Sequence, residues 1–243
     1  MKSSWGRVRH LFGVPEHAPA WRDRGAAVLT SLVGIFVVVV VSQATEGNDL
    51  SSSSLWLVGS IGASAVLVFA VPHGPLSQPW PVLGGHGVSA VVGIVVAHAV
   101  GGGPFAAALA VAAAIGAMHV ARCIHPPGGA TALAAVMMTT AGRVPSWQYP
   151  LTPVLLNAAT IVVAAIVLNA PFAWRRYPIA WAFPHPQTVH QESVDHEPPF
   201  TREQLDVALR ELGSVVYISD DELQALYQSL RRQQAGHGSD APA

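Results

Sequence analysis

A histidine, two prolines and two glycines stand together in the sequence, with a threonine close behind. The segment at 125–131 reads His-Pro-Pro-Gly-Gly-Ala-Thr. Prolines fix the backbone at the start of a helix and cost little there, because the amides of the first turn have no partner within the helix. The glycines let a ligand or another backbone come close. The pattern predicts a helix that begins at the prolines and points into the protein.

Such a helix start would suit a small anion. The backbone amides of the first turn and the positive end of the helix dipole attract negative charge. A hydroxyl group and a histidine that changes charge near neutral pH would add to this attraction. In the alternative, the prolines form only a rigid turn between two helices. The residues expected to bind the anion are His125, Pro126, Pro127, Gly128, Gly129 and Thr131.

A second group of small and hydroxyl residues lies at 59–64, where the sequence is Gly-Ser-Ile-Gly-Ala-Ser. Its glycines would weaken a helix at mid-depth and expose amides and hydroxyls. We expect Ser60, Gly62 and Ser64 to form a counterpart to the first site. Arg122, just before the His-Pro-Pro turn, would add positive potential at its mouth or serve only as an anchor at the membrane surface.

Histidines are the other residues that could carry chemistry. His86 lies in a Gly-Gly-His-Gly segment, whose small neighbours leave room for a functional ring. Its alternative role is a hydrogen bond between two helices, and His98 and His119 are expected to be packing or interfacial residues. No pair of histidines with a nearby carboxylate completes a set of metal ligands, and there is one cysteine. Neither a metal nor a cofactor is therefore expected.

The elements that must position these residues belong in a membrane. Only 11% of the 243 residues are charged and 51% are hydrophobic, whereas about a quarter of a soluble domain is charged. Between residues 25 and 174 the charged side chains are Glu46, Asp49, Arg122 and Arg143. With 13 basic and 14 acidic residues, the chain has no basic excess for nucleic acid. The composition predicts one integral membrane domain with a polar tail.

Six apolar segments are candidates for membrane helices. They are 25–43, 55–71, 82–101, 105–122, 128–142 and 153–170. The second and fifth are short and rich in Gly, Ala, Ser and Thr, so we expect them inside the bundle. If they are re-entrant instead, four full crossings remain. The preferred fold is all-α, a polytopic bundle of six spans.

Basic residues predict how this bundle lies in a cell inner membrane. They gather before the first span, after the fourth, and after the sixth at Arg175 and Arg176, which are expected to be anchors. The loops on the opposite side carry one basic residue, Arg143. An even number of spans then places both termini in the cytoplasm. No small-residue cleavage site follows the basic N-terminus, which indicates an anchor rather than a cleaved signal.

Composition divides the chain into four parts. A basic cytoplasmic segment covers 1–24, the transmembrane domain 25–174, and a linker rich in proline and histidine 175–199. The last part, 200–243, has two capping boxes, each ahead of a stripe of apolar residues. It predicts a small cytoplasmic helical hairpin, which is a surface appendage, an oligomer contact or a docking site.

Two stretches of the sequence match in register. Gly-Ala-Ser-Ala-Val-Leu at 62–67 aligns with Gly-Ala-Thr-Ala-Leu-Ala at 129–134, and Pro-Val-Leu stands near the start of both the third and the sixth span. The match suggests two units of three spans, and an odd number of spans inverts the second unit relative to the first. Inverted repeats place a transport site between the halves, often at broken helices. A chance match of small residues is the alternative.

Several of these segments, in this order, resemble the HPP family of integral membrane proteins. They are 59–67, Pro-Leu-Ser-Gln-Pro at 75–79, Gly-Gly-His at 84–86, and 125–133, within a similarity that spans roughly 25–170. The family is described as having four or so transmembrane segments and as containing candidate transporters. Its plant plastid and cyanobacterial members are associated with nitrite transport. The resemblance therefore implies a small anion as substrate.

Two hypotheses follow for the function. The preferred one is a transporter or channel for a small monovalent anion, nitrite first, with membrane lipid as its other partner. Proton coupling through histidine is left open. An enzyme is not expected, because the spans lack a nucleophile with a base, a carboxylate pair or a metal set. The other hypothesis is a membrane scaffold or sensor acting through its tail, and the small-residue helix faces would also permit a homo-oligomer.

Overall fold

A computed structural model describes residues 11–12, 19–46 and 52–182 of the chain. Residues 21–186 form one compact unit. Most of the linker predicted at 175–199, and the whole helical hairpin predicted at 200–243, lie outside the described residues. The fold that positions the site is that of the unit 21–186.

Within the described part of this unit, the regular elements are helices. The longer ones are α2 (Trp21–Glu46), α3 (Ser52–Ala65), α4 (Pro79–Ala99), α5 (Pro104–Val120), α6 (Pro126–Thr140) and α7 (Leu156–Asn169). A π-helix, Val66–Ala70, continues α3, and another, Pro150–Leu155, leads into α7. The 3-10 helices Pro75–Ser77 and Ala173–Arg175 and the four-residue α8 (Ile179–Ala182) are short. All six apolar segments contain a helix, which confirms the all-α prediction.

Among the residues that the structure describes, three helical stretches are long and apolar enough to cross a membrane: Trp21–Thr45, Pro79–Ala99 and Pro150–Asn169. By contrast, α5 has 17 residues and α6 has 15. At 1.5 Å per residue they are about 26 and 22 Å long, less than the ~30 Å of a hydrocarbon core. A membrane protein with three candidate spans is therefore supported, and the bundle of six full crossings stays a prediction.

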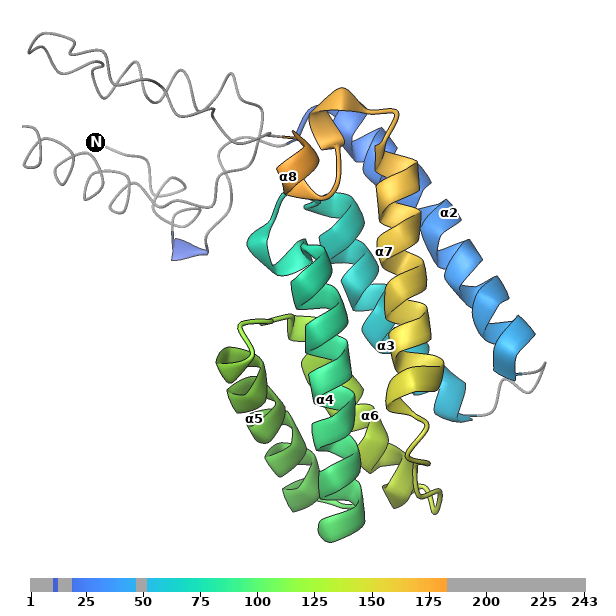
Figure 1. Cartoon of the computed structure of the whole chain (residues 1–243), viewed down its shortest axis with the longest axis vertical. Coiled ribbons are helices and arrows are strands. Elements are labelled where there is room, and N and C mark those ends of the chain that lie inside the picture. The colour runs from blue at the N-terminus through green and yellow to red at the C-terminus, as the bar shows by residue number, and fades with distance from the viewer. Residues whose placement is uncertain (1–10, 13–18, 47–51, 183–243) are drawn as a thin grey trace, which may run out of the picture. The chain divides into compact units, whose positions relative to one another are not determined.

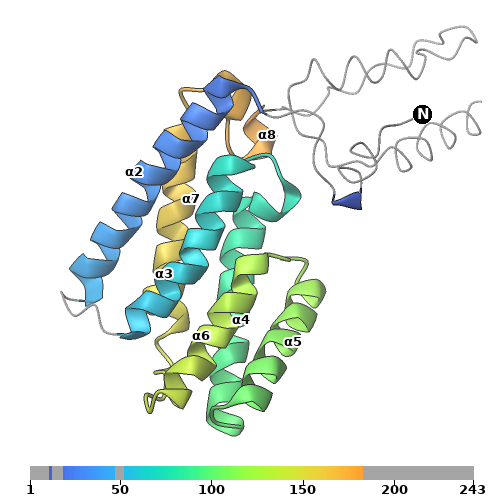
Figure 2. The same ribbon diagram turned by 180° about the vertical axis from the view of Figure 1, so that it is seen from behind.

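Consecutive helices run in opposite directions through the bundle (Figures 1 and 2). The helix at its centre is α4, which packs on α5 and most extensively on α6, while α2 packs on α7 and α3 packs on α6. The halves α2–α4 and α5–α7 therefore pass through the bundle in opposite senses. This arrangement suits the inverted repeat, which stays a prediction.

Glycines bring α4 and α6 into close contact. A Cβ atom added at Gly93 would lie 2.7 Å from the carbonyl oxygen of Ala132, and one added at Gly128 would lie 2.8 Å from that of Gly85. A Cβ atom at Gly85 would lie 2.5 Å from Cβ of His125. Small residues at helix contacts are the usual means of association in membranes. The start of α6 thus lies beside the seventh residue of α4, about 9 Å along that helix from its first residue.

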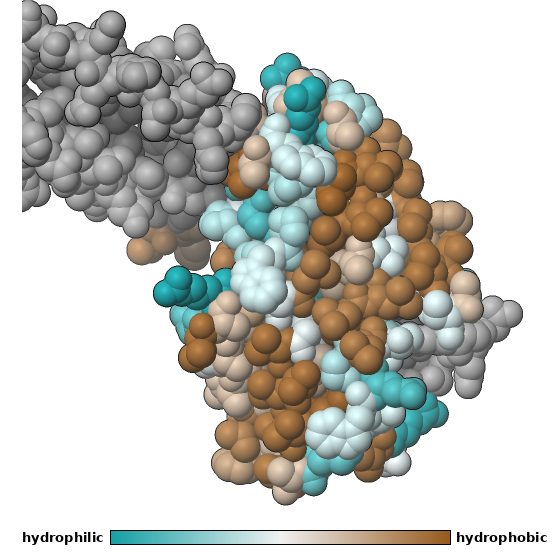
Figure 3. All heavy atoms as spheres, viewed as in Figure 1, coloured by the Kyte–Doolittle hydropathy of each residue, from teal (hydrophilic) through white to brown (hydrophobic). Residues whose placement is uncertain are grey.

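Apolar side chains cover the outside of the long helices. Figure 3 shows brown, hydrophobic surface over much of this unit, with polar patches at its ends and partway down its left side. Large exposed side chains on α2, α4 and α7 contribute to it, among them Leu32, Phe36, Val91, Val95, Val163 and Val167. Such a surface favours lipid over water.

Candidate functional site

Four side chains from α3, α4 and the start of α6 form one hydrogen-bonded chain. Oγ of Ser64 lies 2.7 Å from Nε2 of His86 and 2.8 Å from Nε2 of His125. The other ring nitrogen of His86 lies 2.7 Å from Oγ1 of Thr131, and that of His125 lies 2.8 Å from the carbonyl oxygen of Leu76. The two rings meet edge to face, with centroids 5.0 Å apart. Ser64, His86, His125 and Thr131 are called the polar cluster below.

The polar cluster is closed to water. All four residues have an exposed fraction of 0%. Burying polar groups without partners is costly, and here every ring nitrogen and hydroxyl has one. The hydroxyl of Tyr149 also donates to the carbonyl oxygen of Thr131, at 3.2 Å. Ionisable residues buried within a membrane bundle mark functional sites more often than structural ones.

The His-Pro-Pro turn positions His125 by simple backbone rules. A residue before proline avoids the helical conformation, and His125 is extended, with φ −142° and ψ 104°. It caps α6, whose first two residues are the prolines. The expected helix start is therefore confirmed, and it lies inside the bundle beside α4.

The amides at this helix start are only partly available. Pro126 and Pro127 have no N–H group, and the Gly128 N–H donates to the carbonyl oxygen of His125, at 2.8 Å. Gly129 is half-buried. An anion bound to the Gly128 amide would have to replace this hydrogen bond, so the predicted role of the two glycines as ligands stays a prediction.

Of the residues predicted on the second span, Ser64 belongs to the polar cluster and the other two lie nearby on the same helix. Ser60 is buried, and its carbonyl oxygen lies 3.2 Å from the Ser64 hydroxyl. Gly62 faces open space. The helix α3 continues through 59–64, and the irregular turn comes directly afterwards, in the π-helix Val66–Ala70.

Arg122 lies on the connection between α5 and α6. Its side chain is exposed, and its φ of 53° is in the left-handed region that residues other than glycine rarely adopt. No hydrogen bond joins the described Arg122 side chain to the polar cluster. Its expected part in anion attraction therefore rests on long-range potential and stays a prediction.

The motif Pro-Leu-Ser-Gln-Pro shapes the loop that holds the end of the cluster. Gln78 Nε2 donates to the carbonyl oxygens of Pro72 and Gly74, at 3.0 and 2.9 Å, and Ser77 Oγ donates to that of Leu67, at 3.0 Å. These bonds fix the backbone around Leu76. The carbonyl oxygen of Leu76 was not predicted to take part, because every residue has a carbonyl and no sequence signal singles one out.

The segment after α7 is bound to this same loop. Tyr177 OH donates to the carbonyl oxygen of Ser77, at 2.8 Å, and the Ile179 N–H donates to Gln78 Oε1, at 3.0 Å. Burial raises the pKa of the Tyr177 hydroxyl, which therefore stays a donor at any physiological pH. The chain that leads to the tail is thus attached to the loop that carries Leu76.

Arg175 is more than the surface anchor that its position predicted. It is buried and donates to the carbonyl oxygen of Phe69, to Asn169 Oδ1 at 3.4 Å and to the carbonyl oxygen of Asp23 at 3.5 Å. Burial lowers the pKa of its guanidinium, and the charge of Asp23 partly offsets that effect. This cation ties α2, the π-helix after α3 and α7 together at one end of the bundle.

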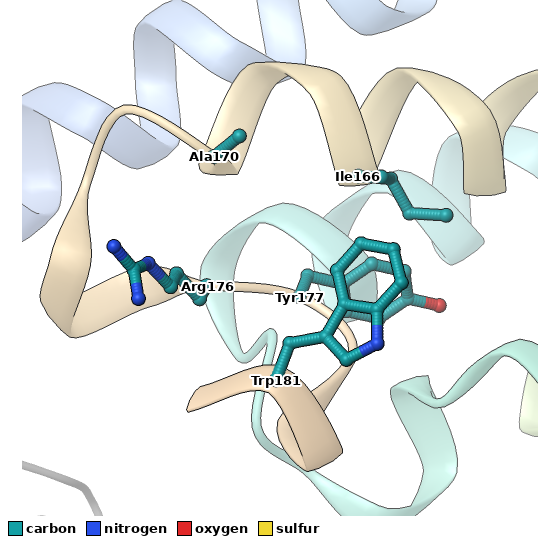
Figure 4. A pocket seen from close by; sticks show the side chains of 5 residues that line it. All are labelled: Ile166, Ala170, Arg176, Tyr177 and Trp181. Carbon is teal, nitrogen blue, oxygen red and sulfur yellow. The ribbon is translucent and has the colours of Figure 1, made fainter. Parts of the chain in front are cut away.

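A pocket of about 260 Å³ lies at the same end, between α7 and α8. It is lined by Ile166, Ala170, Arg176, Tyr177 and Trp181. In Figure 4 the Trp181 indole lies over Tyr177 on the side of Ile166, while the Arg176 guanidinium points away. Its lining shares no residue with the polar cluster.

Metal ligands do not gather in the part of the chain that the structure describes. No three His, Cys, Asp or Glu side chains there come close enough to hold an ion. The polar cluster itself offers two imidazoles and two hydroxyls, a donor set without a carboxylate or thiolate that a zinc site would favour. The absence of a metal stays a prediction for the whole chain.

Comparison with known proteins identifies relatives over the membrane domain. The profile of the family described as "HPP, transmembrane region" matches residues 16–178. One transmembrane protein of Dictyostelium discoideum is 37% identical over 161 residues, 65% of this chain and 50% of the relative. Another from the same organism is 36% identical over 170 residues, 67% of this chain and 57% of the relative. The chain thus spans about half the length of these relatives, and no solved structure matches it.

Proposed function

Because this chain belongs to the HPP transmembrane family, we propose that it moves a small monovalent anion, nitrite first, across the cell inner membrane. The observation that carries the proposal is the polar cluster, a chain of two imidazoles and two hydroxyls buried among apolar helices. A transporter must replace the water around its ion with oriented polar groups. In this account the cluster supplies those groups.

The charge of the region favours an anion over a cation. Between Asp49 and Glu192 the sequence contains no Asp or Glu. Cation pathways in membranes are usually lined by carboxylates or rings of carbonyl oxygens. The cluster instead presents hydroxyl and imidazole groups, which can donate hydrogen bonds to a negative ion.

The internal repeat supports a site between two halves. In the register of the match between 62–67 and 129–134, Ser64 aligns with Thr131. These two hydroxyls contact opposite nitrogens of the same His86 ring, at 2.7 Å each. An inverted repeat places equivalent residues on either side of a central site. We infer that His86 lies at that centre and that the bundle has six crossings in two inverted units.

The closed cluster corresponds to an occluded state in this proposal. For an anion to reach it, α6 must shift against α4, where glycine contacts let the helices lie close. The proposal includes no chemical reaction on the anion, so the chain acts as a carrier and not as an enzyme.

Nitrite uptake into liposomes that hold the purified full chain tests this function. Protein-free liposomes and mildly alkaline buffer control for nitrous acid that crosses the bilayer unaided. We expect saturable uptake, competition by some of chloride, nitrate and formate, and loss of uptake in His125→Ala. The proposal is wrong if protein with an intact elution profile and thermal unfolding transition moves none of these anions.

A further inference from the structure

We propose that the polar cluster takes up one proton, that this proton reverses the direction of its hydrogen bonds, and that an anion and a proton cross the membrane together. The anion comes from the proposed function. The proton step depends only on the donors and acceptors that the described side chains offer.

With both imidazoles neutral, one arrangement of protons forms all four hydrogen bonds of the cluster at once. The carbonyl oxygen of Leu76 can only accept, so Nδ1 of His125 donates and its Nε2 accepts. The donor to that Nε2 is Ser64, whose single proton is then used. Ser64 therefore accepts from Nε2 of His86, and Nδ1 of His86 accepts from Thr131. The bonds all point from Thr131 toward Leu76, and the two imidazoles are opposite tautomers.

The polar cluster accommodates one added proton if the hydrogen bonds among its four side chains reverse direction. The proton binds Oγ1 of Thr131, whose own proton passes to Nδ1 of His86. The Nε2 proton of His86 passes to Ser64, and the Ser64 proton passes to Nε2 of His125. His125 is then an imidazolium, and His86 is neutral with its proton on Nδ1. The Thr131 hydroxyl now donates to the carbonyl oxygen of Pro127, 3.4 Å away. Every ring nitrogen and every hydroxyl keeps a hydrogen-bond partner in both states.

The neighbouring elements offer no second ionised group that would cancel this charge. The helices α3, α6 and α7 and both π-helices carry no titratable side chain. His98 and His119 are in the last turns of α4 and α5. The loops that connect the helices from α3 to α7 carry no carboxylate in their sequence, and their titratable residues are His73, Arg122, Cys123, Arg143 and Tyr149. A proton bound to the cluster therefore gives it one uncompensated positive charge.

That charge links the proton to the anion. The polar cluster contains no Lys or Arg, so it becomes cationic only by taking up a proton. A buried anion needs a compensating charge, and a buried imidazolium needs one equally. A second proton would put two imidazolium rings 5.0 Å apart, where they repel each other. The expected stoichiometry is one proton per anion, with no net charge moved.

The first test measures both ions in the same liposomes. Nitrite uptake by the wild-type protein is followed together with the internal pH, read by a trapped fluorescent dye, with and without an imposed membrane potential. We expect one proton taken up per nitrite and a rate that the potential does not change. Nitrite uptake without protons, or driven by the potential, overturns the proton step and leaves the proposed function standing.

A pair of serine variants connects the coupling to the cluster. Ser64→Ala removes the hydroxyl between the two imidazoles. Ser89→Ala is the matched control, because Ser89 is also buried, lies on α4 with His86, and has a hydroxyl without a hydrogen-bond partner among the described residues. We expect Ser64→Ala to lose proton uptake and Ser89→Ala to keep the wild-type ratio of protons to nitrite. A wild-type ratio in Ser64→Ala contradicts the relay.

A spectroscopic test needs no transport and so stands even if no anion is moved. Nitrogen-15 magnetic resonance of the wild-type protein, assigned with His86→Asn and His125→Asn, reports which ring nitrogen carries hydrogen. We expect opposite tautomers at high pH, with hydrogen on Nε2 of His86 and on Nδ1 of His125. On acidification His125 becomes an imidazolium while His86 changes tautomer. Identical tautomers, or two imidazolium ions formed together, overturn the proton step.

Discussion

At the scale of single residues, the site depends on two hydroxyl residues that contact the same imidazole. Ser64 and Thr131 are far apart in the sequence, and each contacts one nitrogen of His86. Because the imidazole of His86 has no other side-chain partner among the described hydrogen bonds, losing either hydroxyl leaves one buried nitrogen unpaired. An unpaired buried group costs about 1–3 kcal/mol.

Replacing Thr131 with valine isolates this effect, because valine keeps the branched shape and removes only the hydroxyl. We expect Thr131→Val to lower the free energy of unfolding by about 1–3 kcal/mol and to reduce nitrite uptake. Thr131→Ser, which keeps the hydroxyl, should remain close to wild type in both. Thermal unfolding in detergent and liposome uptake measure the two effects. Equal behaviour of the valine and serine variants would show that the hydroxyl plays no part.

At the scale of helices, the contact between α4 and α6 holds the two histidines together. Gly128 is one of the close points, since a Cβ atom there would lie 2.8 Å from both the Gly85 carbonyl oxygen and Ser89 Oγ. By contrast, a Cβ atom at Gly129 would have Val111 Cγ1, at 3.8 Å, as its nearest neighbour. Two adjacent glycines therefore have different structural roles.

The alanine variants of these glycines form a matched pair. Gly128→Ala forces the helices apart, and we expect it to destabilise the protein by about 1–3 kcal/mol. Gly129→Ala has room for its methyl group, and alanine is favoured over glycine in a helix by up to about 1 kcal/mol, so its unfolding temperature should stay level or rise. Thermal unfolding of both variants in detergent measures this difference in stability. A Gly128→Ala protein as stable as Gly129→Ala would mean that α4 and α6 are not in close contact at this point.

A second element contact, between the loop at 71–78 and the segment after α7, predicts a dependence on pH. His73 Nε2 lies 3.0 Å from the carbonyl oxygen of Arg176. Burial lowers the pKa of His73; the hydrogen bond to Arg176 partly raises it, and the charge of Arg175 lowers it further. The folded protein therefore binds this proton less readily than the unfolded chain, whose histidine has a pKa of about 6.5. This contribution to stability is complete above that pH and is lost as the pH falls.

Measuring the unfolding temperature from neutral to mildly acid pH checks the sign. We expect His73→Gln, which keeps a donor for the carbonyl oxygen, to lose less stability on acidification than wild type. A variant that loses as much as wild type over this range would show that the protonation of His73 does not weaken the fold.

Local rules predicted much of this architecture, and contacts between distant segments account for the rest. The two prolines predicted the start of α6, since they act on their own backbone. The alignment of 62–67 with 129–134 paired Ser64 with Thr131, but nothing in the sequence joined either hydroxyl to His86. The buried position of Arg175 was missed because its carbonyl partners on α2 and the first π-helix have no sequence signal. No sequence signal marks Ser89 either, whose buried hydroxyl has no hydrogen-bond partner among the described residues.

At the scale of the whole molecule, the number of crossings depends on the short helices α5 and α6. If both cross fully, the loops that follow the helices alternate between the two sides of the membrane. Cysteines placed one at a time at Val100, Val120, Arg143 and Ala173, in a Cys123→Ala protein, sample four of these loops, and all four positions are exposed. A maleimide that does not cross the membrane should label the first and third from outside and the second and fourth only after lysis. Labelling of the positions at 100 and 120 from the same side would rule out six crossings.

The most direct test of the central claim compares two histidines on one helix. His86 lies in the polar cluster, whereas His98, near the end of the same α4, bonds the carbonyl oxygen of Ile94 and stacks on Trp147. Nitrite uptake is measured for wild type, His86→Asn and His98→Asn at equal amounts of folded protein in liposomes. We predict that His86→Asn loses at least about tenfold in rate, the equivalent of one lost hydrogen bond to a charged group, while His98→Asn stays close to wild type. Equal rates in the two variants would contradict transport through the polar cluster.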